Sequence, residues 1–514
     1  MKTLRFLLAL ALGVGLTLAM LWLLSPSPVR ANPRIRYVSS SSDCGGYGGC
    51  YAAIQPAIDA SADGDEIRVA AGTYKGTAPV VVGTTTYTQT AAIVNKTLTL
   101  AGGYTITNWT VADPVANVTI IDADRKGRGV TIIGTGTQAV TLTGFTITGG
   151  DYTGMGNAPG VSWAACGSTG ADCGGGLYAN WVRLFVGKCV IADNIAGVKT
   201  NLTEGGGAAL YSLLPGSRIE STDFVSNTAL TPWGRGGGAY VAFGYDLAFA
   251  GCRFQDNSSY DEGGGLSIHQ PASAVVVQDT TFTRNAASDD YGGGIAAYLT
   301  APGLALRLDR VTMRDNQAYG TGAAMHLLKI GTGESRVEMT NVLMAGNSLK
   351  DPVDTGSAVY VEEWSGNLNL QAAHLTIADN PAPAAICLAL ISTDRLTATL
   401  TNTLVVSAST VFVMDEKVGG ELILRHTKTL TWKTGLMHTV VAGTPDYHAT
   451  SLLSGDPKFD AAYHLRRGSA AINAGVDAGL MRDIDYNRRP IGSAPDIGAD
   501  EYGLFRYFPV VMSK

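Results

Sequence analysis

Charged residues are scarce in this chain of 514 residues, where they make up 16% of the sequence against about 25% in a typical globular protein. The 37 lysines and arginines are outnumbered by 43 acidic residues, which leaves a formal net charge of −6. A protein that binds a phosphate backbone needs a basic surface, and this composition offers none. We therefore expect no nucleic acid partner.

Several sequence patterns that carry chemistry are missing as well. We find no zinc-ligand spacing, no phosphate-binding glycine loop and no Ser, Cys or His nucleophile motif. Long runs of helical periodicity are also missing, and short alternating runs stand in their place. These absences exclude the commonest motif-defined enzyme classes and favour a fold made of short strands.

Glycine, in contrast, is abundant, with 64 residues in the chain. A triple glycine recurs with starts 31, 31, 27 and 29 residues apart, at 174–176, 205–207, 236–238, 263–265 and 292–294. Between these blocks lies a second motif, an aromatic or large apolar residue three positions before an asparagine, as in Phe224…Asn227, Phe254…Asn257 and Phe282…Asn285. A regular period near thirty residues indicates a solenoid.

About thirty residues per turn fits two or three short strands joined by tight bends, which is one coil of a parallel β-helix. Coils would stack about 4.8 Å apart, so equivalent residues should form columns along the interior. We expect Asn at bends where a left-handed backbone is tolerated, with amides bonded along the stack, and Gly at the opposite bend. The predicted inward column three residues before each Asn is Ile191, Phe224, Phe254, Phe282, Met313, Met344 and Ile377.

These alternating Gly-Gly-x and Phe-x-x-Asn motifs resemble the repeats of polymorphic outer-membrane proteins, whose passengers are β-helical adhesins. More generally, residues 35–450 resemble right-handed parallel β-helix proteins of the pectin-lyase-like type. The resemblance implies an all-β, right-handed parallel β-helix solenoid. No membrane β-barrel pattern follows the repeats, so autotransport is not implied.

Four segments are expected along the chain. Residues 1–31, with Lys2 and Arg5 before an apolar run from Phe6 to Leu24, predict a secretory signal peptide, or alternatively an uncleaved membrane anchor. Residues 32–450 hold the repeats. Residues 451–503, from Gly455-Asp-Pro to Asp496-Ile-Gly-Ala-Asp-Glu501, resemble the choice-of-anchor Q domain of secreted β-helix proteins, although Asn473 and Tyr486 replace its usual Asp and Gly. Residues 504–514 form an apolar tail too short to span a bilayer.

Two further segments carry structural expectations. Ile54 and Ile58 lie on one helical face, so residues 51–74 predict a helix that caps the open first coil. Residues 151–173 read as an insertion, and residues 411–450 as irregular final coils.

Seven cysteines suit an oxidising compartment. Short loops separate Cys44 from Cys50 and Cys166 from Cys173, so each pair is a candidate disulfide. Cys189 and Cys252 fall in one inward column two coils apart, about 9–10 Å, beyond bridging distance. We expect them, and Cys387, to be buried free thiols.

A row of rings is predicted on an outward strand face. Counting from each glycine block, the second and fourth residues should point outward. Such rings could stack on sugars, or loops could cover them as ordinary strand residues. The candidate ligand-binding residues are Tyr178, Tyr211, Tyr240, His269, Tyr298, His326 and Tyr360.

Acidic residues gather beside the glycine blocks. Glu204, Arg235 and Glu262 precede successive blocks and read either as an acid–base group or as a lateral charge ladder. Asp289 and Asp290 are weak catalytic candidates, because the Asn-Thr-Asp, Gly-His-Gly and Arg-Ile-Lys motifs of polygalacturonase-like enzymes are missing.

Near the C-terminus, the run from Asp483 through Asp485 to Asn487 begins like a calcium loop. However, Arg488 replaces the required Gly and Ala494 the bidentate Glu, so an EF-hand is excluded. A looser Ca²⁺ site that includes Asp496 stays open, as does pairing of these carboxylates with Arg482, Arg488 or Arg489. No other cofactor is expected.

The sequence thus predicts an exported monomer, extracellular or on the cell surface, that binds carbohydrate or cell surfaces without a membrane span in the mature chain. The alternative is a polysaccharide lyase or glycoside hydrolase that acts along the outer strand face. An outward face that gathers two carboxylates with a cationic partner would favour the alternative.

Overall fold

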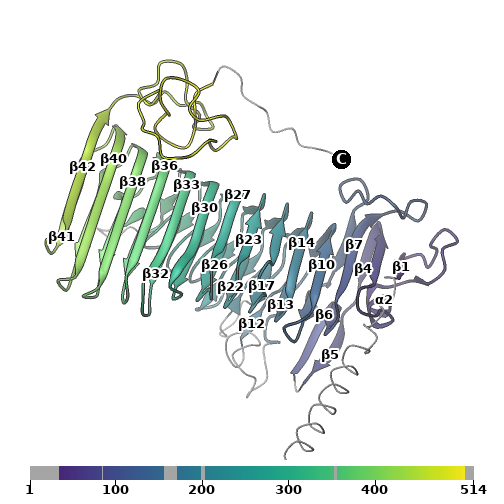
Figure 1. Cartoon of the computed structure of the whole chain (residues 1–514). Helices are drawn as coiled ribbons and strands as arrows, with labels where there is room; N and C mark the ends of the chain where they lie inside the picture. Colours follow the sequence, from purple (N-terminus) through teal and green to yellow (C-terminus); the bar gives the residue numbers. More distant parts are fainter. Residues whose placement is uncertain (1–33, 84, 156–170, 198–202, 352–355, 504–514) are drawn as a thin grey trace, which may run out of the picture.

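The computed structural model describes residues 34–83, 85–155, 171–197, 203–351 and 356–503. The predicted signal peptide, Cys166 and the apolar tail lie outside these residues. Figure 1 shows a ladder of strands that runs the length of the molecule, with the C-terminal module against one side of its last coils. The predicted all-β solenoid is confirmed as a parallel β-helix.

Sheet 1 is the largest sheet of the described chain, and its strands pair in parallel from coil to coil. Its strands are β1 (Ile35–Val38), β2 (Cys50–Tyr51), β3 (Glu66–Ala70), β4 (Gly72–Lys75), β7 (Leu98–Tyr104), β8 (Thr119–Asp122), β10 (Ala139–Thr143), β11 (Phe145–Thr148), β14 (Arg183–Gly187), β15 (Val190–Ala192), β18 (Arg218–Glu220), β19 (Asp223–Val225), β23 (Leu247–Ala250), β24 (Arg253–Gln255), β27 (Val275–Thr283), β30 (Gly303–Arg314), β33 (Ser335–Ala345), β36 (Leu368–Ala378), β38 (Arg395–Val406), β40 (Glu421–Trp432) and β42 (Asp446–Ser454).

Sheet 2 forms the opposite wall and is parallel except for the first hairpin, β5–β6. Its strands are β5 (Ala78–Val82), β6 (Thr85–Val94), β9 (Arg128–Ile133), β13 (Leu177–Asn180), β17 (Ala208–Tyr211), β22 (Ala239–Ala242), β26 (Leu266–His269), β29 (Ile295–Leu299), β32 (Met325–Lys329), β35 (Ser357–Glu363), β37 (Ala384–Leu390), β39 (Thr410–Glu416) and β41 (Leu436–Ala442).

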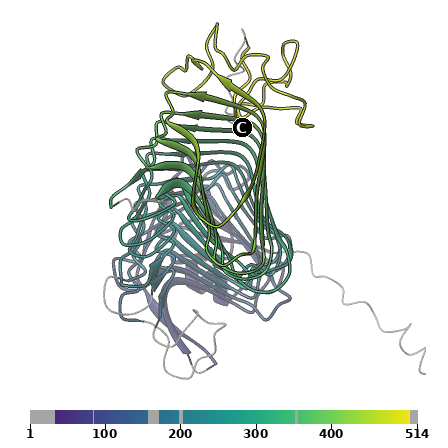
Figure 2. The same cartoon turned by 90° about the vertical axis from the view of Figure 1, so that its left-hand side faces the viewer.

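Two small sheets close the bends of the middle coils. Sheet 3 contains β20 (Thr228–Ala229), β25 (Ser258–Ser259), β28 (Ala286–Ala287), β31 (Gln317–Ala318) and β34 (Ser348–Leu349). Sheet 4 contains β12 (Asp172–Cys173), β16 (Thr203–Glu204) and β21 (Gly234–Arg235). Figure 2, which looks along the solenoid, shows the coils superimposed around one interior.

The interior column of large side chains is confirmed. Phe224 pairs in register with Phe254, and Phe254 with Phe282. Their rings are stacked, with centroids 4.6 and 4.7 Å apart and planes within 4° and 6° of parallel. This spacing is that of neighbouring strands, so each coil buries its aromatic face against the next.

The asparagines form a continuous buried ladder. Asn257 donates its side-chain amide to Asn285 Oδ1 at 2.9 Å and to the Phe224 carbonyl at 2.8 Å, and it accepts from Asn227. The predicted bonding along the stack is therefore confirmed. The predicted backbone was wrong, because the residue before each Asn takes the left-handed conformation, as Asp256 does at φ 55°, and thereby turns the amide inward.

The glycine blocks have two distinct physical roles. Gly236 adopts φ 64°, the left-handed region that a residue with a Cβ rarely occupies. Gly238 has an ordinary φ, but an added Cβ would lie 2.6 Å from the Gly265 carbonyl oxygen of the next coil. The first glycine thus makes the bend, and the third allows the coils to approach.

Both ends of the solenoid differ from the middle. Helix α2 (Ile54–Asp59) buries Ile54, Ala57 and Ile58 against the first coil, which confirms the predicted cap. At the other end, residues 411–450 are regular strands rather than irregular coils, and β42 runs to Ser454, past the predicted boundary at residue 450. None of the described helices is long and apolar enough to cross a bilayer.

The cysteine expectations are met where the structure describes them. Cys44 and Cys50 form a disulfide. Cys189, Cys252 and Cys387 are buried free thiols. The pairing of Cys166 with Cys173 stays a prediction, because Cys166 lies outside the described residues.

Candidate functional site

A row of charged side chains crosses the bend between sheets 4 and 2. Glu204 of β16 pairs in register with Arg235 of β21, and Arg235 forms a bridge with Glu262 on the next coil. Arg235 Nε lies 2.7 Å from Glu262 Oε1 and 3.5 Å from Asp261 Oδ2. The lateral charge ladder is therefore confirmed, but Glu204 and Glu262 are buried rather than exposed.

Burial and neighbouring charges set the protonation of this ladder. Burial alone would raise the pKa of Glu262, but His269, whose Nε2 lies 3.3 Å from Oε2, and Arg235 hold it below its ordinary value. Burial opposes the charge on Arg235, yet Glu262 and Glu204 outweigh it and raise its pKa above the ordinary value. The Arg235–Glu262 pair is thus fully ionised.

Glu204 behaves differently from Glu262. Its carboxylate accepts a hydrogen bond from the Tyr211 hydroxyl. Burial raises the pKa of Glu204 to about 7, and the charge of Arg235 offsets only part of that rise. Glu204 is therefore partly protonated at neutral pH.

Asp261 and Asp290 bring two carboxyl groups together on adjacent coils. Each lies two residues before a triple glycine, so stacking in register places the side chains in contact. Burial, and then the neighbouring carboxylates, raise the pKa of both groups, and that of Asp290 further. The pair therefore holds a proton at pH values where an ordinary aspartate, with a pKa of about 4, is ionised.

Half-exposed tyrosines surround these acids. Tyr260 has its hydroxyl group against Asp289, Tyr291 against Asp290, and Tyr298 against Glu262. We call this surface the tyrosine–carboxylate patch; it consists of Arg235, Tyr260, Asp261, Glu262, Asp289, Asp290, Tyr291 and Tyr298. Tyr298 stacks on His269 and Tyr291 on His326, with centroids 4.4 and 4.5 Å apart, so one face of each of these two rings is covered. The patch offers tyrosine rings, in part exposed, and hydrogen-bond acceptors on neighbouring coils.

The predicted row of outward rings exists but is mostly covered. Tyr298 is half-exposed, whereas six of the seven candidates are buried: Tyr178, Tyr211, Tyr240, His269, His326 and Tyr360. Tyr178 packs with Ala171 and Cys173 at the end of the insertion, so chain from another bend covers it. The premise of an open row of rings is wrong for these six residues.

Grouped with Tyr211 and His269, the residues His326 and Tyr360 would occupy the fourth position after the glycine block, and this prediction is wrong. His326 pairs with Ala296 and with Tyr360, which places both residues in the second-position column. In this coil, residues 322–324 are Gly-Ala-Ala rather than a triple glycine. Without the glycine block as a reference, the position of His326 along its strand was assigned wrongly. The rings still stack, with the centroids of His326 and Tyr360 5.4 Å apart.

The contact between Asp261 and Asp290 was missed in the sequence. Alignment of the glycine blocks is the signal that could have found it, because each aspartate lies two residues before a block. Of the original catalytic candidates, Asp290 belongs to this contact, whereas Asp289 is exposed and faces Tyr260.

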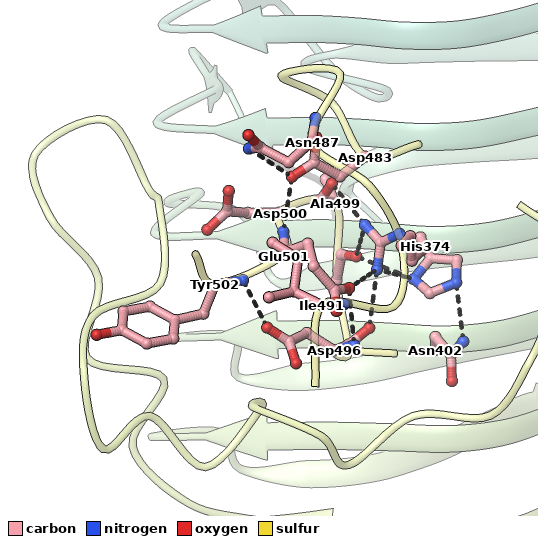
Figure 3. Close-up of polar contacts among 12 residues, drawn as sticks. His374, Asn402, Asp483, Asn487, Ile491, Asp496, Ala499, Asp500, Glu501 and Tyr502 are labelled. Carbon is pink, nitrogen blue, oxygen red and sulfur yellow. Dashed lines mark hydrogen bonds and ion pairs between the residues drawn. The ribbon is translucent and has the colours of Figure 1, made fainter. Parts of the chain in front are cut away.

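The C-terminal module carries the other predicted site. Asp483 accepts backbone N–H groups from Asp485 and Asn487 on Oδ1 and from Glu501 on Oδ2. Asp496 accepts from Asn473 and Tyr502, one on each oxygen. Asp483 and Asp496 therefore hold loops together (Figure 3). Asp485 is grouped instead with His464 and Asp500.

Arg489 fixes this module to sheet 1, but it forms its ion pair with Glu501 and not with the carboxylates that were the expected partners. It is buried, with Nη1 3.1 Å from Glu501 Oε2 and 2.7 Å from His374 Nδ1 of β36. Burial and then the charge of Arg489 lower the pKa of His374 to about 3, so the imidazole is neutral. Asn402 completes the junction by hydrogen bonding to His374 Nε2 (Figure 3).

Comparisons with known proteins give distant matches. No protein-family model and no curated protein matches the chain. Among solved structures, it is similar to the crystal structure of pectate lyase Pel9A, with 12% identity and a TM-score of 0.34, over 92% of this chain and 97% of that one. It is also similar to the Siphovirus 9NA tailspike receptor binding domain, with 8% identity and a TM-score of 0.19, over 82% and 79% of the two chains. Ligand and activity must therefore be argued from the geometry.

Proposed function

We propose that this chain is an exported solenoid that binds glycans through the tyrosine–carboxylate patch. The observation that carries the proposal is that half-exposed Tyr260, Tyr291 and Tyr298 each set a hydroxyl group against a carboxylate, on neighbouring coils. The Cys44–Cys50 disulfide suits an oxidising compartment outside the cytoplasm.

The chemistry of the patch suits neutral sugars. Aromatic faces pack against the apolar faces of sugar rings, and carboxylates accept hydrogen bonds from hydroxyl groups. The single arginine is already ion-paired with Glu262, so the patch has no spare positive charge. Acidic polysaccharides would meet repulsion from Asp289 and its neighbours, and we therefore propose a neutral glycan.

The patch gathers carboxylates around Arg235, the arrangement expected to favour the enzyme alternative, but two features favour binding over cleavage. A β-elimination would require a cationic residue to give up its proton, but the acids around Arg235 raise its pKa. Glycosidases separate their two carboxyl groups by about 5–5.5 Å or more, whereas those of Asp261 and Asp290 are in contact. Hydrolysis by water activated at this pair is the alternative outcome.

A glycan array probed with the chain from residue 32 onward tests the proposal. We expect Tyr291→Ala and Tyr298→Ala each to weaken retention of neutral glycans about 2- to 13-fold, since a stacked ring contributes about 0.5–1.5 kcal/mol. Tyr245→Ala, an exposed tyrosine at a different bend, is the matched control and should bind normally.

Unchanged retention in both patch variants would overturn the proposal. A parallel assay for reducing sugars and unsaturated products separates binding from catalysis. Product release that is abolished by Asp290→Asn would establish the hydrolytic alternative instead.

A further inference from the structure

Three potential metal ligands converge in the C-terminal module, far in sequence from the tyrosine–carboxylate patch. His464, Asp485 and Asp500 each offer a ligand atom, and these atoms all lie within 4.8 Å of one another. The three residues line a cavity of about 230 Å³ between the module and sheet 1, where Arg314 and Thr376 form part of the wall. Three separate loops thus meet at one point.

Contacts with neighbouring groups orient the His464 imidazole and the Asp500 carboxylate. His464 Nε2 lies 2.8 Å from Asp485 Oδ2, and Nδ1 lies 3.4 Å from Asp460 Oδ1 on the opposite side of the ring. Asp500 accepts the Leu465 N–H on Oδ2 at 2.6 Å. A carboxylate behind the imidazole is the arrangement that orients histidine ligands in metal sites.

The neighbouring carboxylates provide an internal contrast. Asp483 and Asp496 receive backbone N–H groups on both oxygens, so their lone pairs are used in holding loops. Figure 3 shows Asp500 directed away from this hydrogen-bonded group and toward the side of the module. Asp485 is partly exposed, which gives an ion a path from solvent.

We propose that His464, Asp485 and Asp500 bind a divalent transition metal of the zinc class. An imidazole nitrogen with two carboxylates suits Zn²⁺, Co²⁺ or Ni²⁺, whereas Ca²⁺ and Mg²⁺ prefer oxygen ligands alone. Bonds of about 2.0–2.1 Å would place the ligand atoms about 3.3 Å apart, so the present separations require shifts of at most about 1.5 Å.

Such an ion would join the loops that carry the three ligands and would face the cavity with its remaining coordination position. It would also balance the negative charge of Asp500, which is buried. The inference is independent of glycan binding, because none of the three ligands belongs to the patch.

The test is a titration of the EDTA-treated, dialysed chain with Zn²⁺ by calorimetry, and with Co²⁺ by visible absorption. We expect one equivalent to bind the wild-type chain, at least about 100-fold weaker binding in His464→Gln and Asp485→Asn, and about 10–100-fold weaker binding in Asp460→Asn. His448→Gln is the matched control, because His448 forms an exposed pair with Asp446 at 2.7 Å and should leave the affinity unchanged.

Several results would overturn the inference. These are no binding by the wild-type chain, binding that survives in His464→Gln at wild-type strength, or loss of binding in His448→Gln alone. Circular dichroism checks the fold of each variant. If His464→Gln does not fold, Asp485→Asn and Asp460→Asn decide the question by the same titration.

Discussion

Two polar ladders run along the solenoid, one neutral and one charged, and they differ in length. The amide ladder passes through seven coils, at Asn194, Asn227, Asn257, Asn285, Asn316, Asn347 and Asn380. The charged ladder consists of Glu204, Arg235 and Glu262 on three coils. An amide both donates and accepts, so identical residues satisfy one another without limit, whereas stacked charges must alternate in sign.

The amide ladder belongs to the architecture of the repeat, whereas the charged ladder creates a local chemical environment. The amide ladder repeats wherever the bend repeats, and it therefore describes the fold. The charged ladder is confined to three coils and has tyrosines of intermediate burial around it. Burial first, and then the neighbouring carboxylates, raise the pKa values of Asp261 and Asp290 beside it. Local departures from a repeat are where function is expected in a solenoid.

Removal of the cation from the charged ladder should have the largest effect on stability. Arg235→Met removes the cation that Glu262 and Glu204 share, both at most 2% exposed, and leaves Glu262 with His269 as its ion-pair partner. Breaking a buried ion pair in this way typically costs about 3–5 kcal/mol. We expect a matching decrease in the unfolding free energy from urea denaturation at pH 7.

Arg284→Met is the matched control for this variant. Arg284 Nε lies 2.7 Å from Asp256 Oδ1, the same separation as in the Arg235–Glu262 pair, but both side chains are exposed. Solvent screens such a pair, so the urea midpoint should stay within error of wild type. Equal midpoint shifts in the two variants would show that burial of the ladder contributes nothing.

A break in the amide ladder should cost less. Asn257→Ala removes the acceptor of Asn227 and the donor to the Phe224 carbonyl, which leaves buried polar groups unsatisfied. Each such group costs about 1–3 kcal/mol, and we expect a total of about 2–4 kcal/mol in urea denaturation. Gln317→Ala, at an exposed position of sheet 3, is the control. A shift no larger than the control would contradict the structural role of the ladder.

The architecture was predictable because it repeats. The columns through Phe254 and Asn257 follow from one period, and in-register stacking then fixes the interior. After Asn380 the final coils replace tight Gly and Asn bends with longer strands such as β38 and β40, so the signal disappeared while the fold continued. The repeated Gly and Asn residues mark the bends, so the sequence period reveals a coil only where its bends keep these residues.

The sites were less predictable because they depend on register and on loops. Contact between Asp261 and Asp290 requires the exact alignment of two coils. The meeting of His464, Asp485 and Asp500 involves three loops with no shared period, so no spacing in the sequence indicates it. The resemblance of residues 451–503 to the choice-of-anchor Q domain stays a prediction.

A further expected effect concerns how the charged ladder responds to pH. Burial raises the pKa of Glu204 to about 7 in the fold, above the value of about 4.5 expected when unfolded. The folded chain therefore binds this proton more tightly, and the resulting stability is present below pH 4.5 and is lost as pH rises through 7.

Glu204→Gln keeps the shape and removes the titration, so its unfolding free energy should fall less than that of wild type between pH 4.5 and 7. Urea denaturation across this interval measures the two slopes, and parallel slopes would mean that Glu204 titrates normally. The amide ladder, which does not titrate, predicts no such slope change for Asn257→Ala, and this contrast distinguishes the charged ladder from the neutral one.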